Sequence, residues 1–365
     1  MNILLLSTLK RKVGPLEFAS RSRVIYQLAT GLVERGHTVS LMGTGDSTIP
    51  GVKIIPIVPK GWVDLPPVEN GFLRETASLL RLAASVREQQ DQFDIIHNHT
   101  YPDFFPSVVE NELSIPLVTT LHALYDEMYM DETLSLYPKT HFVALSEAYK
   151  KLYQKTRIDF VVYNGVNTNL YAYEEKKEEY LFWLGRLPKA RNKDGSFMDP
   201  KGVRYAVQLA RETGIPLKLA GVVEDAAFYE EDVKPFLSEK IQWVGDVSSK
   251  QSLSVEEVVS LMQKAKAFLM TINQQEPFGL VMAEAMSCGT PVIAFNRGSV
   301  AEIVKNGVTG YVVDPEDGIG GLKQAAKRIS EIKPEDCRFH VEEHFTIEKM
   351  VEGYENVYKK ILGAK

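Results

Sequence analysis

The chain has 365 residues, of which 44% are hydrophobic and 25% charged, with a formal net charge of −6. This length suits two domains, and the acidic balance argues against general nucleic-acid binding, which needs a basic surface. Two cysteines, Cys288 and Cys337, exclude a disulfide framework and favour a reducing, cytoplasmic setting. No apolar run is long enough to span a membrane, and the first half has no excess of positive charge, so at most weak peripheral membrane contact is expected.

Short apolar stretches alternate with longer amphipathic ones, a pattern typical of parallel sheets covered by helices on both faces. A helix is predicted over residues 20–35, ended by Gly36 as a C-terminal cap. Strands of the first half are predicted at residues 2–7, 38–42, 94–97, 116–120, 140–145 and 160–163.

The alternation restarts after a charged segment, Glu174 to Glu179. A last helix is predicted over 347–362. The sequence therefore predicts an α/β protein with two doubly wound domains, and in such sheets ligands bind beyond the carboxyl ends of the strands, which makes a cleft between the sheets the expected site. Strands of the second half are predicted at residues 180–184, 217–220, 241–244, 267–270, 291–294 and 310–313.

The most informative segment is EPFGLVMAEAM, residues 276–286, which follows a predicted strand and enters a helix. Glu276 precedes that helix and Glu284 lies two turns along it, so both can face one ligand. The N–H groups near Gly279 and Leu280 form an anion site, because a helix start has unsatisfied donors and a positive dipole end. A sugar diphosphate fits this arrangement, although periodicity alone favours an ordinary amphipathic helix with a capping acid.

This run, continued by SCGTPVIA at 287–294, resembles the EPFGLVxxEAMxxGxPVI signature of the family-4 retaining glycosyltransferases. The resemblance implies the GT-B fold, two Rossmann-like domains facing a central cleft. An N-terminal acceptor domain, 1–163, would be followed by a nucleotide-sugar donor domain, 164–345, and the C-terminal helix, 346–365, would cross back to the first domain. The implied reaction moves a hexosyl group from a nucleoside diphosphate sugar to an acceptor hydroxyl with retained anomeric configuration.

The resemblance also implies roles for single residues of this segment. Glu276 would bind hydroxyls of the donor sugar, and Glu284 would hold the ribose hydroxyls. Phe278, Gly279 and Leu280 would offer main-chain donors to the sugar and the phosphates.

A second signal is Gly185-Arg186 at the end of a predicted strand, with Lys201 further on. In the family, a Gly-Arg-Leu and a nearby Lys-Gly clamp the diphosphate. Such a leaving group gains negative charge as the glycosidic bond breaks, and positioned cations stabilise it without a general acid. Arginine can do so bidentately and lysine as a point charge.

The spacing departs from the family pattern, because an insertion, Pro188 to Pro200, separates the two cations. The insertion carries rival cations, Lys189, Arg191 and Lys193, which we interpret as part of an exposed loop. Lys201 is favoured because it leads directly into a predicted helix, 203–213.

Three histidines lie at predicted strand ends of the first half. His122 matches the family histidine that follows a Thr-x-His strand and would contact the donor sugar near the reacting centre. His99 and Asp103 are less specific candidates for acceptor contacts. His97 is expected to pack or to fix a loop.

The loop after the first strand contains Gly14, where the family often has two glycines near the phosphate. Arg21 and Arg23, just beyond it, are expected to lie on an exposed helix surface. Val247 follows a predicted strand in the region where similar enzymes read the base through main-chain groups. Such contacts leave little trace in side-chain identity, so family frequency alone favours UDP, with GDP second.

The resemblance favours a same-face mechanism in which the departing phosphate oxygen helps to deprotonate the acceptor. No metal or other cofactor is expected, because the cations and the helix end already cover the phosphates. Two alternatives stay open: a sugar-nucleotide epimerase of the same fold, and a non-catalytic nucleotide-sugar-binding module. The acceptor is expected to be a small sugar, a polyol or a glycoconjugate, and the acidic, aromatic stretch 124–136 suits a polar acceptor or an exposed loop equally well.

Overall fold

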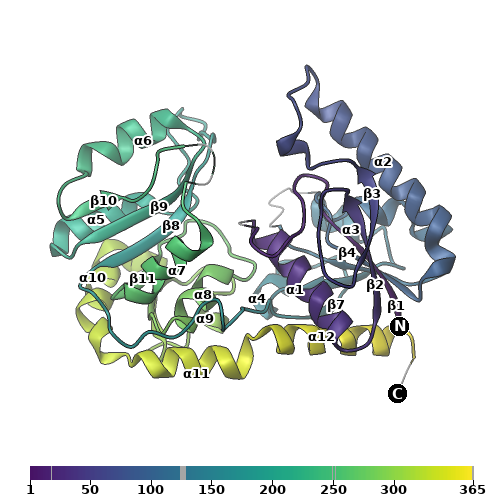
Figure 1. Cartoon of the computed structure of the whole chain (residues 1–365). Coiled ribbons are helices and arrows are strands. Elements are labelled where there is room, and N and C mark those ends of the chain that lie inside the picture. Colours follow the sequence, from purple (N-terminus) through teal and green to yellow (C-terminus); the bar gives the residue numbers. More distant parts are fainter. Residues whose placement is uncertain (18, 124–128, 249, 251, 364–365) are drawn as a thin grey trace. The chain divides into compact units, whose positions relative to one another are not determined.

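The computed structural model describes residues 1–17, 19–123, 129–248, 250 and 252–363. They form two compact units (Figure 1). Unit 1 comprises Met1–Gly165 and Ile347–Lys365, and unit 2 comprises Val166–Thr346. Each unit contains one parallel sheet with helices, so the predicted fold class of two doubly wound α/β domains is confirmed.

Unit 1 has a seven-stranded sheet in the order β3-β2-β1-β4-β5-β6-β7. All neighbouring strands are parallel, and the central ones are almost wholly buried, as expected where helices cover both faces. The chain winds outward in both directions from the adjacent strands β1 and β4, which makes this pair the topological switch point. The strands are β1 (Asn2–Leu6), β2 (Thr38–Thr44), β3 (Lys53–Val58), β4 (Ile95–Asn98), β5 (Leu117–Thr120), β6 (His141–Ala144) and β7 (Ile158–Val161).

The C-terminal helix α12 (Ile347–Ile361) belongs to unit 1, where it packs against α1 (Ser20–Glu34). The two helices approach closely at Gly31, since a Cβ atom there would lie 2.5 Å from a methyl carbon of Val351. The other helices of unit 1 are α2 (Gly71–Gln89), α3 (Met130–Leu134) and α4 (Glu147–Lys150), with short 3-10 turns η1 (Trp62–Asp64), η2 (Gln90–Gln92) and η3 (Phe105–Glu112).

Unit 2 has a six-stranded parallel sheet in the order β10-β9-β8-β11-β12-β13, with its switch point between β8 and β11. The strands are β8 (Leu181–Leu187), β9 (Leu217–Val223), β10 (Ile241–Trp243), β11 (Ala267–Met270), β12 (Val292–Phe295) and β13 (Gly310–Val313). The helices are α5 (Val203–Thr213), α6 (Ala226–Asp232), α7 (Val255–Lys264), α8 (Leu280–Ser287), α9 (Val300–Ile303), α10 (Gly318–Arg328) and α11 (Pro334–His344), with 3-10 turns η4 (Lys234–Phe236), η5 (Pro315–Asp317) and η6 (Ile329–Glu331).

Several strands differ from the sequence-based expectation, and β2, β8 and β9 each extend two or three residues beyond their predicted ends. β3 was not predicted; it contains Pro56, which is tolerated because β3 is the edge strand of its sheet. β7 begins two residues before the predicted range 160–163. Among the described helices, none is long and apolar enough to cross a membrane.

Candidate active site

The switch point of unit 2 fixes the main chain of Lys201. Pairing between β8 and β11 stops at Trp183, whereas β8 continues alongside β9 to its end. The indole N–H of Trp183 donates to the Lys201 carbonyl at 3.0 Å, and the Thr271 hydroxyl donates to the Gly202 carbonyl at 2.7 Å. Gly202 has φ +70°, and a Cβ atom there would lie 1.6 Å from the Thr271 carbonyl oxygen. Only glycine fits, and it places Lys201 at the carboxyl edge of the sheet.

This placement brings Lys201 into contact with Glu276, 75 positions later in the chain. The Lys201 Nζ atom lies 3.1 Å from the Glu276 Oε2 atom, and the two side chains are 30% and 14% exposed. The Glu276 carbonyl accepts a hydrogen bond from the Ser299 N–H at 2.9 Å. A Cβ atom on Gly298 would lie 2.5 Å from the Glu276 backbone nitrogen, so glycine is needed there for close approach. The predicted phosphate-binding cation and the predicted sugar-binding carboxylate therefore form one ion pair.

The helix start predicted to bind phosphate lies directly beside this pair. Gly279 immediately precedes α8 with φ +76°, and a Cβ atom on it would lie 3.2 Å from the Glu276 Cγ atom. Phe278, Leu280 and Glu284 are all buried. The left-handed glycine thus turns the chain from Glu276 into the helix, with the first-turn N–H groups at the same edge of the sheet.

Arg186 lies at the end of β8 and is 60% exposed, with its guanidinium 3.4 Å from the Glu224 carboxylate. Its neighbour Gly185 leaves room for Lys201, since a Cβ atom on it would lie 3.2 Å from the Lys201 Cβ atom. Val247 is exposed on the loop after β10. The adjacent Ser248 carbonyl accepts the N–H of the last residue of β9 at 2.8 Å, so this loop lies beside the same edge of the sheet.

In unit 1 the three predicted histidines form a chain of hydrogen bonds. The His122 Nε2 atom is 2.8 Å from the His99 Nδ1 atom, and the His99 Nε2 atom is 3.2 Å from the His97 Nδ1 atom. The same Nδ1 atom of His97 is 2.6 Å from the Tyr358 hydroxyl of α12. Burial lowers the pKa of all three imidazoles, that of His99 to about 3, so they are uncharged at neutral pH.

Asp103 fixes the main chain at His122. Its Oδ2 atom accepts the N–H groups of His122 and Ala123 at 2.7 and 3.0 Å, and its Oδ1 atom lies 2.6 Å from the Arg21 guanidinium. Burial raises the pKa of this carboxyl, and the charge of Arg21 opposes that rise. The expectation that Arg21 lies on an exposed surface was wrong, because its side chain is only 16% exposed. Asp103 and His99 are fully buried, and their contact with an acceptor stays a prediction.

The loop that contains Gly14 is held against the turn after β2. The Val13 N–H donates to the Ser47 hydroxyl, and the Thr48 N–H donates to the Val13 carbonyl, both at 2.9 Å. Gly14 itself is buried, and its contact with the donor stays a prediction. Arg23, expected at the surface, is buried as well. In the stretch proposed for the acceptor, residues 124–128 lie outside the described part of the chain.

Comparison with known proteins identifies the family. Residues 22–170 match the family described as Glycosyltransferase Family 4, and residues 173–342 match the one described as Glycosyl transferases group 1. The chain belongs to the family-4 glycosyltransferases. It is therefore a transferase that acts on glycosyl groups.

Individual relatives of this glycosyltransferase agree with the assignment. It is 24% identical over 374 residues to N-acetyl-alpha-D-glucosaminyl L-malate synthase of Bacillus anthracis, covering 92% of each chain. The sucrose-phosphate synthase structure from Thermosynechococcus elongatus has a TM-score of 0.76 at 20% identity, with both chains fully covered. HepE of Anabaena, solved with UDP-glucose, has a TM-score of 0.68 at 16% identity, covering 99% of this chain and all of that one. The two structures share the GT-B fold with this chain.

The insertion of this glycosyltransferase is a hairpin rather than an open loop. Arg191 and Phe197 form an antiparallel bridge, and the guanidinium stacks over the Phe197 ring at 3.4 Å. Arg191 also lies 3.2 Å from the Asp225 carboxylate, and Phe197 stacks on Phe228 at 5.0 Å. Arg191 is exposed, as interpreted from the sequence, and its contacts with Asp225 and Phe197 attach the hairpin to the start of α6. The two lysines of the insertion are exposed.

One residue that supports the site was missed from the sequence. The Asp199 carboxylate accepts the N–H groups of Val203 and Arg204, each at 3.0 Å, and so occupies the start of α5. Burial raises the pKa of this carboxyl. The Asp199 carbonyl accepts a hydrogen bond from the Asn273 amide at 2.7 Å, which ties the segment before Lys201 to the chain after β11. An aspartate just before an amphipathic helix is a capping signal that could have revealed it.

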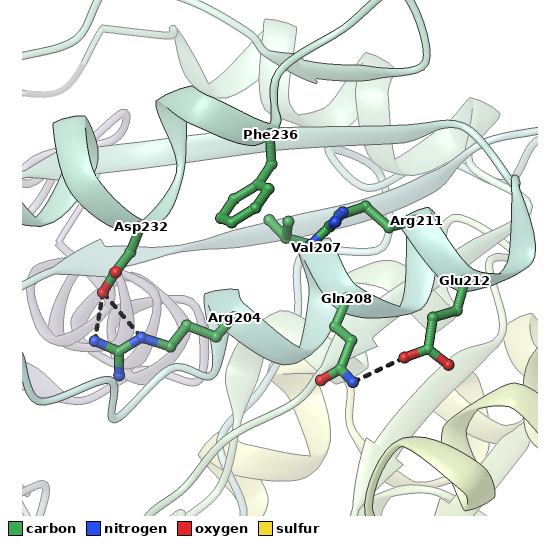
Figure 2. Close-up of a pocket in the computed structure, with 7 residues that line it drawn as sticks. All are labelled: Arg204, Val207, Gln208, Arg211, Glu212, Asp232 and Phe236. Atoms are coloured by element: carbon green, nitrogen blue, oxygen red, sulfur yellow. Dashed lines mark hydrogen bonds and ion pairs between the residues drawn. The ribbon is translucent and has the colours of Figure 1, made fainter.

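A pocket of about 470 Å³ lies on the glycosyltransferase between α5 and the α6–η4 segment (Figure 2). Its polar side chains bind one another: Arg204 donates to Asp232 at 2.9 Å and Gln208 donates to Glu212 at 2.8 Å. None of the predicted site residues lines it, so it is a separate surface feature. Its lining residues are Arg204, Val207, Gln208, Arg211, Glu212, Asp232 and Phe236.

Proposed function

We propose that this glycosyltransferase moves a hexosyl group from a nucleoside diphosphate sugar to an acceptor hydroxyl with retained configuration. UDP-sugars are the first candidates and GDP-sugars the second. The observation that carries the proposal is the Lys201–Glu276 ion pair beside the Gly279-led helix start, because it combines a cation, a carboxylate and main-chain donors at one sheet edge. The fold similarity to HepE, solved with UDP-glucose, supports a uridine donor.

The donor would bind in unit 2, where its diphosphate would replace carboxylates as the partner of the cations. Lys201 and Arg186 are both held by carboxylates, Glu276 and Glu224. A diphosphate attracts both cations and would take Lys201 away from Glu276. The Glu276 carboxylate is then available to accept hydroxyl groups of the sugar. Glu284 would hold the ribose hydroxyls, and Val247 lies on the loop proposed to face the base.

The reaction would break the bond from the anomeric carbon to the phosphate oxygen and form one to the acceptor oxygen on the same face. The acceptor proton passes to the departing phosphate oxygen, so the products are the glycoside and the nucleoside diphosphate. Lys201, Arg186 and the start of α8 stabilise the charge that develops on the leaving group. We propose that this charge stabilisation requires no metal ion, and that the neutral imidazole of His122 meets a hydroxyl of the transferred sugar.

The acceptor is proposed to be a small sugar, a polyol or a glycoconjugate. His99 and Asp103 are the candidate contacts, and both are fully buried in this structure. Gly14 is proposed to approach the donor phosphate through its main chain.

The test is a thermal-shift panel of UDP, GDP, ADP and dTDP and their hexose conjugates, in the presence of EDTA. A ligand that binds only the folded state raises the melting temperature. We expect a selective rise with one nucleotide that is reduced in Glu284→Ala and kept in Glu256→Ala, a control that removes an exposed glutamate. No rise with any nucleotide would contradict the donor site.

Product analysis by NMR then tests the chemistry with the donor that binds. Transfer with retained anomeric configuration is expected in EDTA. An inverted product would contradict the same-face mechanism, and a strict metal requirement would contradict the role given to the cations. Isomerisation of the donor without an acceptor would instead indicate an epimerase.

A further inference from the structure

The histidine chain of unit 1 ends on two tyrosines of α12. Tyr354 and Tyr358 are fully buried and four residues apart, so they lie on the same face of the helix. The Tyr358 hydroxyl contacts the His97 Nδ1 atom at 2.6 Å, and the Tyr354 hydroxyl contacts the Thr120 hydroxyl at 3.0 Å. Residues from the very end of the chain therefore complete a buried polar network that reaches His122, at the carboxyl edge of the sheet.

The short contact between Tyr358 and His97 sets the first proton in this network. Burial raises the pKa of the Tyr358 phenol well above its ordinary value, so the hydroxyl keeps its proton. A phenol can donate or accept, but its O–H is a far stronger acid than the N–H of a neutral imidazole, so donation from Tyr358 to the His97 Nδ1 lone pair is the favoured direction. The proton of His97 then resides on Nε2, where it is donated to the Thr120 hydroxyl at 2.8 Å.

The tautomer of His97 determines the tautomers of His99 and then His122. Because the His97 Nδ1 atom has no proton, its longer 3.2 Å contact with the His99 Nε2 atom is a hydrogen bond only if His99 donates, and the one Nδ1 lone pair is then shared between Tyr358 and His99. The His99 proton is then on Nε2 and its Nδ1 atom is an acceptor. The 2.8 Å contact with His122 therefore requires a proton on the His122 Nε2 atom. The other ring nitrogen of His122, Nδ1, carries a lone pair.

We propose that Tyr358 is a positioning residue that fixes His122 as the Nε2–H tautomer through His97 and His99. The Nδ1 atom of His122 is then a hydrogen-bond acceptor for a hydroxyl of the transferred sugar, a final step that rests on the proposed function. The reverse order, with all three histidines protonated on Nδ1, would satisfy the same histidine contacts and would make His122 a donor. The Tyr358 hydroxyl favours one of these two directions, because a phenol in contact with the His97 Nδ1 atom favours the tautomer in which that atom accepts.

Nitrogen NMR of the full-length protein, labelled with ¹⁵N-histidine, tests the tautomer directly. The signal of His122 is assigned by its loss in His122→Gln. In the wild type we expect a protonated Nε2 and an unprotonated Nδ1 for His122. A protonated Nδ1 would overturn the proposal, and this measurement needs no variant of the network to fold.

The variant Tyr358→Phe should allow both directions of the histidine hydrogen bonds and give His122 a measurable Nδ1–H population. Tyr354→Phe is the matched control: it removes a buried hydroxyl from the same helix, but that hydroxyl contacts Thr120 and no ring nitrogen. The control should leave the His122 tautomer unchanged. An unchanged tautomer in Tyr358→Phe, or the same change in both variants, would overturn the role of Tyr358.

A kinetic measurement separates this inference from the proposed function. Tyr358→Phe should lower kcat/KM with the nucleotide sugar about tenfold, the value of one hydrogen bond, while the affinity for the nucleoside diphosphate alone stays unchanged. A tautomer change without a rate change would support the control of the His122 tautomer by Tyr358, and it would overturn the contact assigned to His122 with the sugar. Weaker binding of the nucleotide itself in this variant would indicate a merely structural effect on the fold and would overturn the positioning role.

Discussion

Lowering the pH from 7 to 5 should destabilise unit 1 through its buried histidines. Burial holds the pKa of His99 at about 3 and lowers that of His97 and His122 in the same direction. In the unfolded chain each imidazole titrates near pH 6.5. The unfolded state therefore binds more protons throughout this range. The contribution of these residues is fully present above pH 6.5 and is lost as the pH falls towards the folded pKa.

The size of the effect follows from the two pKa values of His99. Between pH 7 and pH 5 the unfolded imidazole becomes almost fully protonated while the buried one stays neutral. The difference is about 2 kcal/mol for this residue alone. His97, which is equally buried, adds to the loss. Because domains of this size are stabilised by about 5–15 kcal/mol, the loss is a measurable fraction of the total.

Urea unfolding at the two pH values, followed by hydrogen exchange of β1, β4 and β5, measures the stability of unit 1 separately. His99→Gln should lower the stability at pH 7 and reduce its pH dependence by about 2 kcal/mol. His141→Gln is the matched control, since it replaces a partly exposed histidine of the same sheet and should keep the full dependence. Equal stability of the wild type at both pH values, or full pH dependence in His99→Gln, would refute the reasoning.

Three further changes act on unit 2. Lys201→Ala should lower kcat/KM about 10- to 100-fold, because it removes a charge-assisted contact to the diphosphate and leaves Glu276 without its partner; a steady-state assay that finds less than a twofold loss would contradict its role. Gly279→Ala should lower the unfolding free energy by about 1–2 kcal/mol, because φ is +76° there, and unchanged denaturation would contradict the strain. Phe197→Ala should cost about 3 kcal/mol by removing the stack on Phe228, and a stability equal to that of the wild type would show that the hairpin is not anchored there.

Much of the architecture was readable from local sequence. Buried parallel strands are short apolar runs and amphipathic helices separate them, so most strands were predicted within one or two residues. The edge strand β3 was missed, since its proline and partly exposed residues do not give that signal. The segment 276–286 identified the family and the predicted donor residues because its chemistry requires particular residue types in one continuous stretch.

The insertion shows what the local sequence leaves undetermined. Its cations are exposed, as that composition indicates, but nothing in 188–200 indicates which residues outside the insertion it contacts. Arg191 pairs with Asp225, which caps α6, and Phe197 stacks on Phe228 of α6, each more than thirty positions away. Contacts of that kind depend on where the fold places α6 relative to the end of β8.

The sequence by itself determined the two doubly wound domains, the family and the segment that contains Glu276, Gly279 and Glu284. These follow from periodicity and from a contiguous motif, both of which are local properties. The tertiary structure alone decided that Lys201 pairs with Glu276 and that Tyr358 completes the histidine chain. Those contacts join residues 75 and 261 positions apart, and only the register of parallel strands and the docking of α12 bring them together.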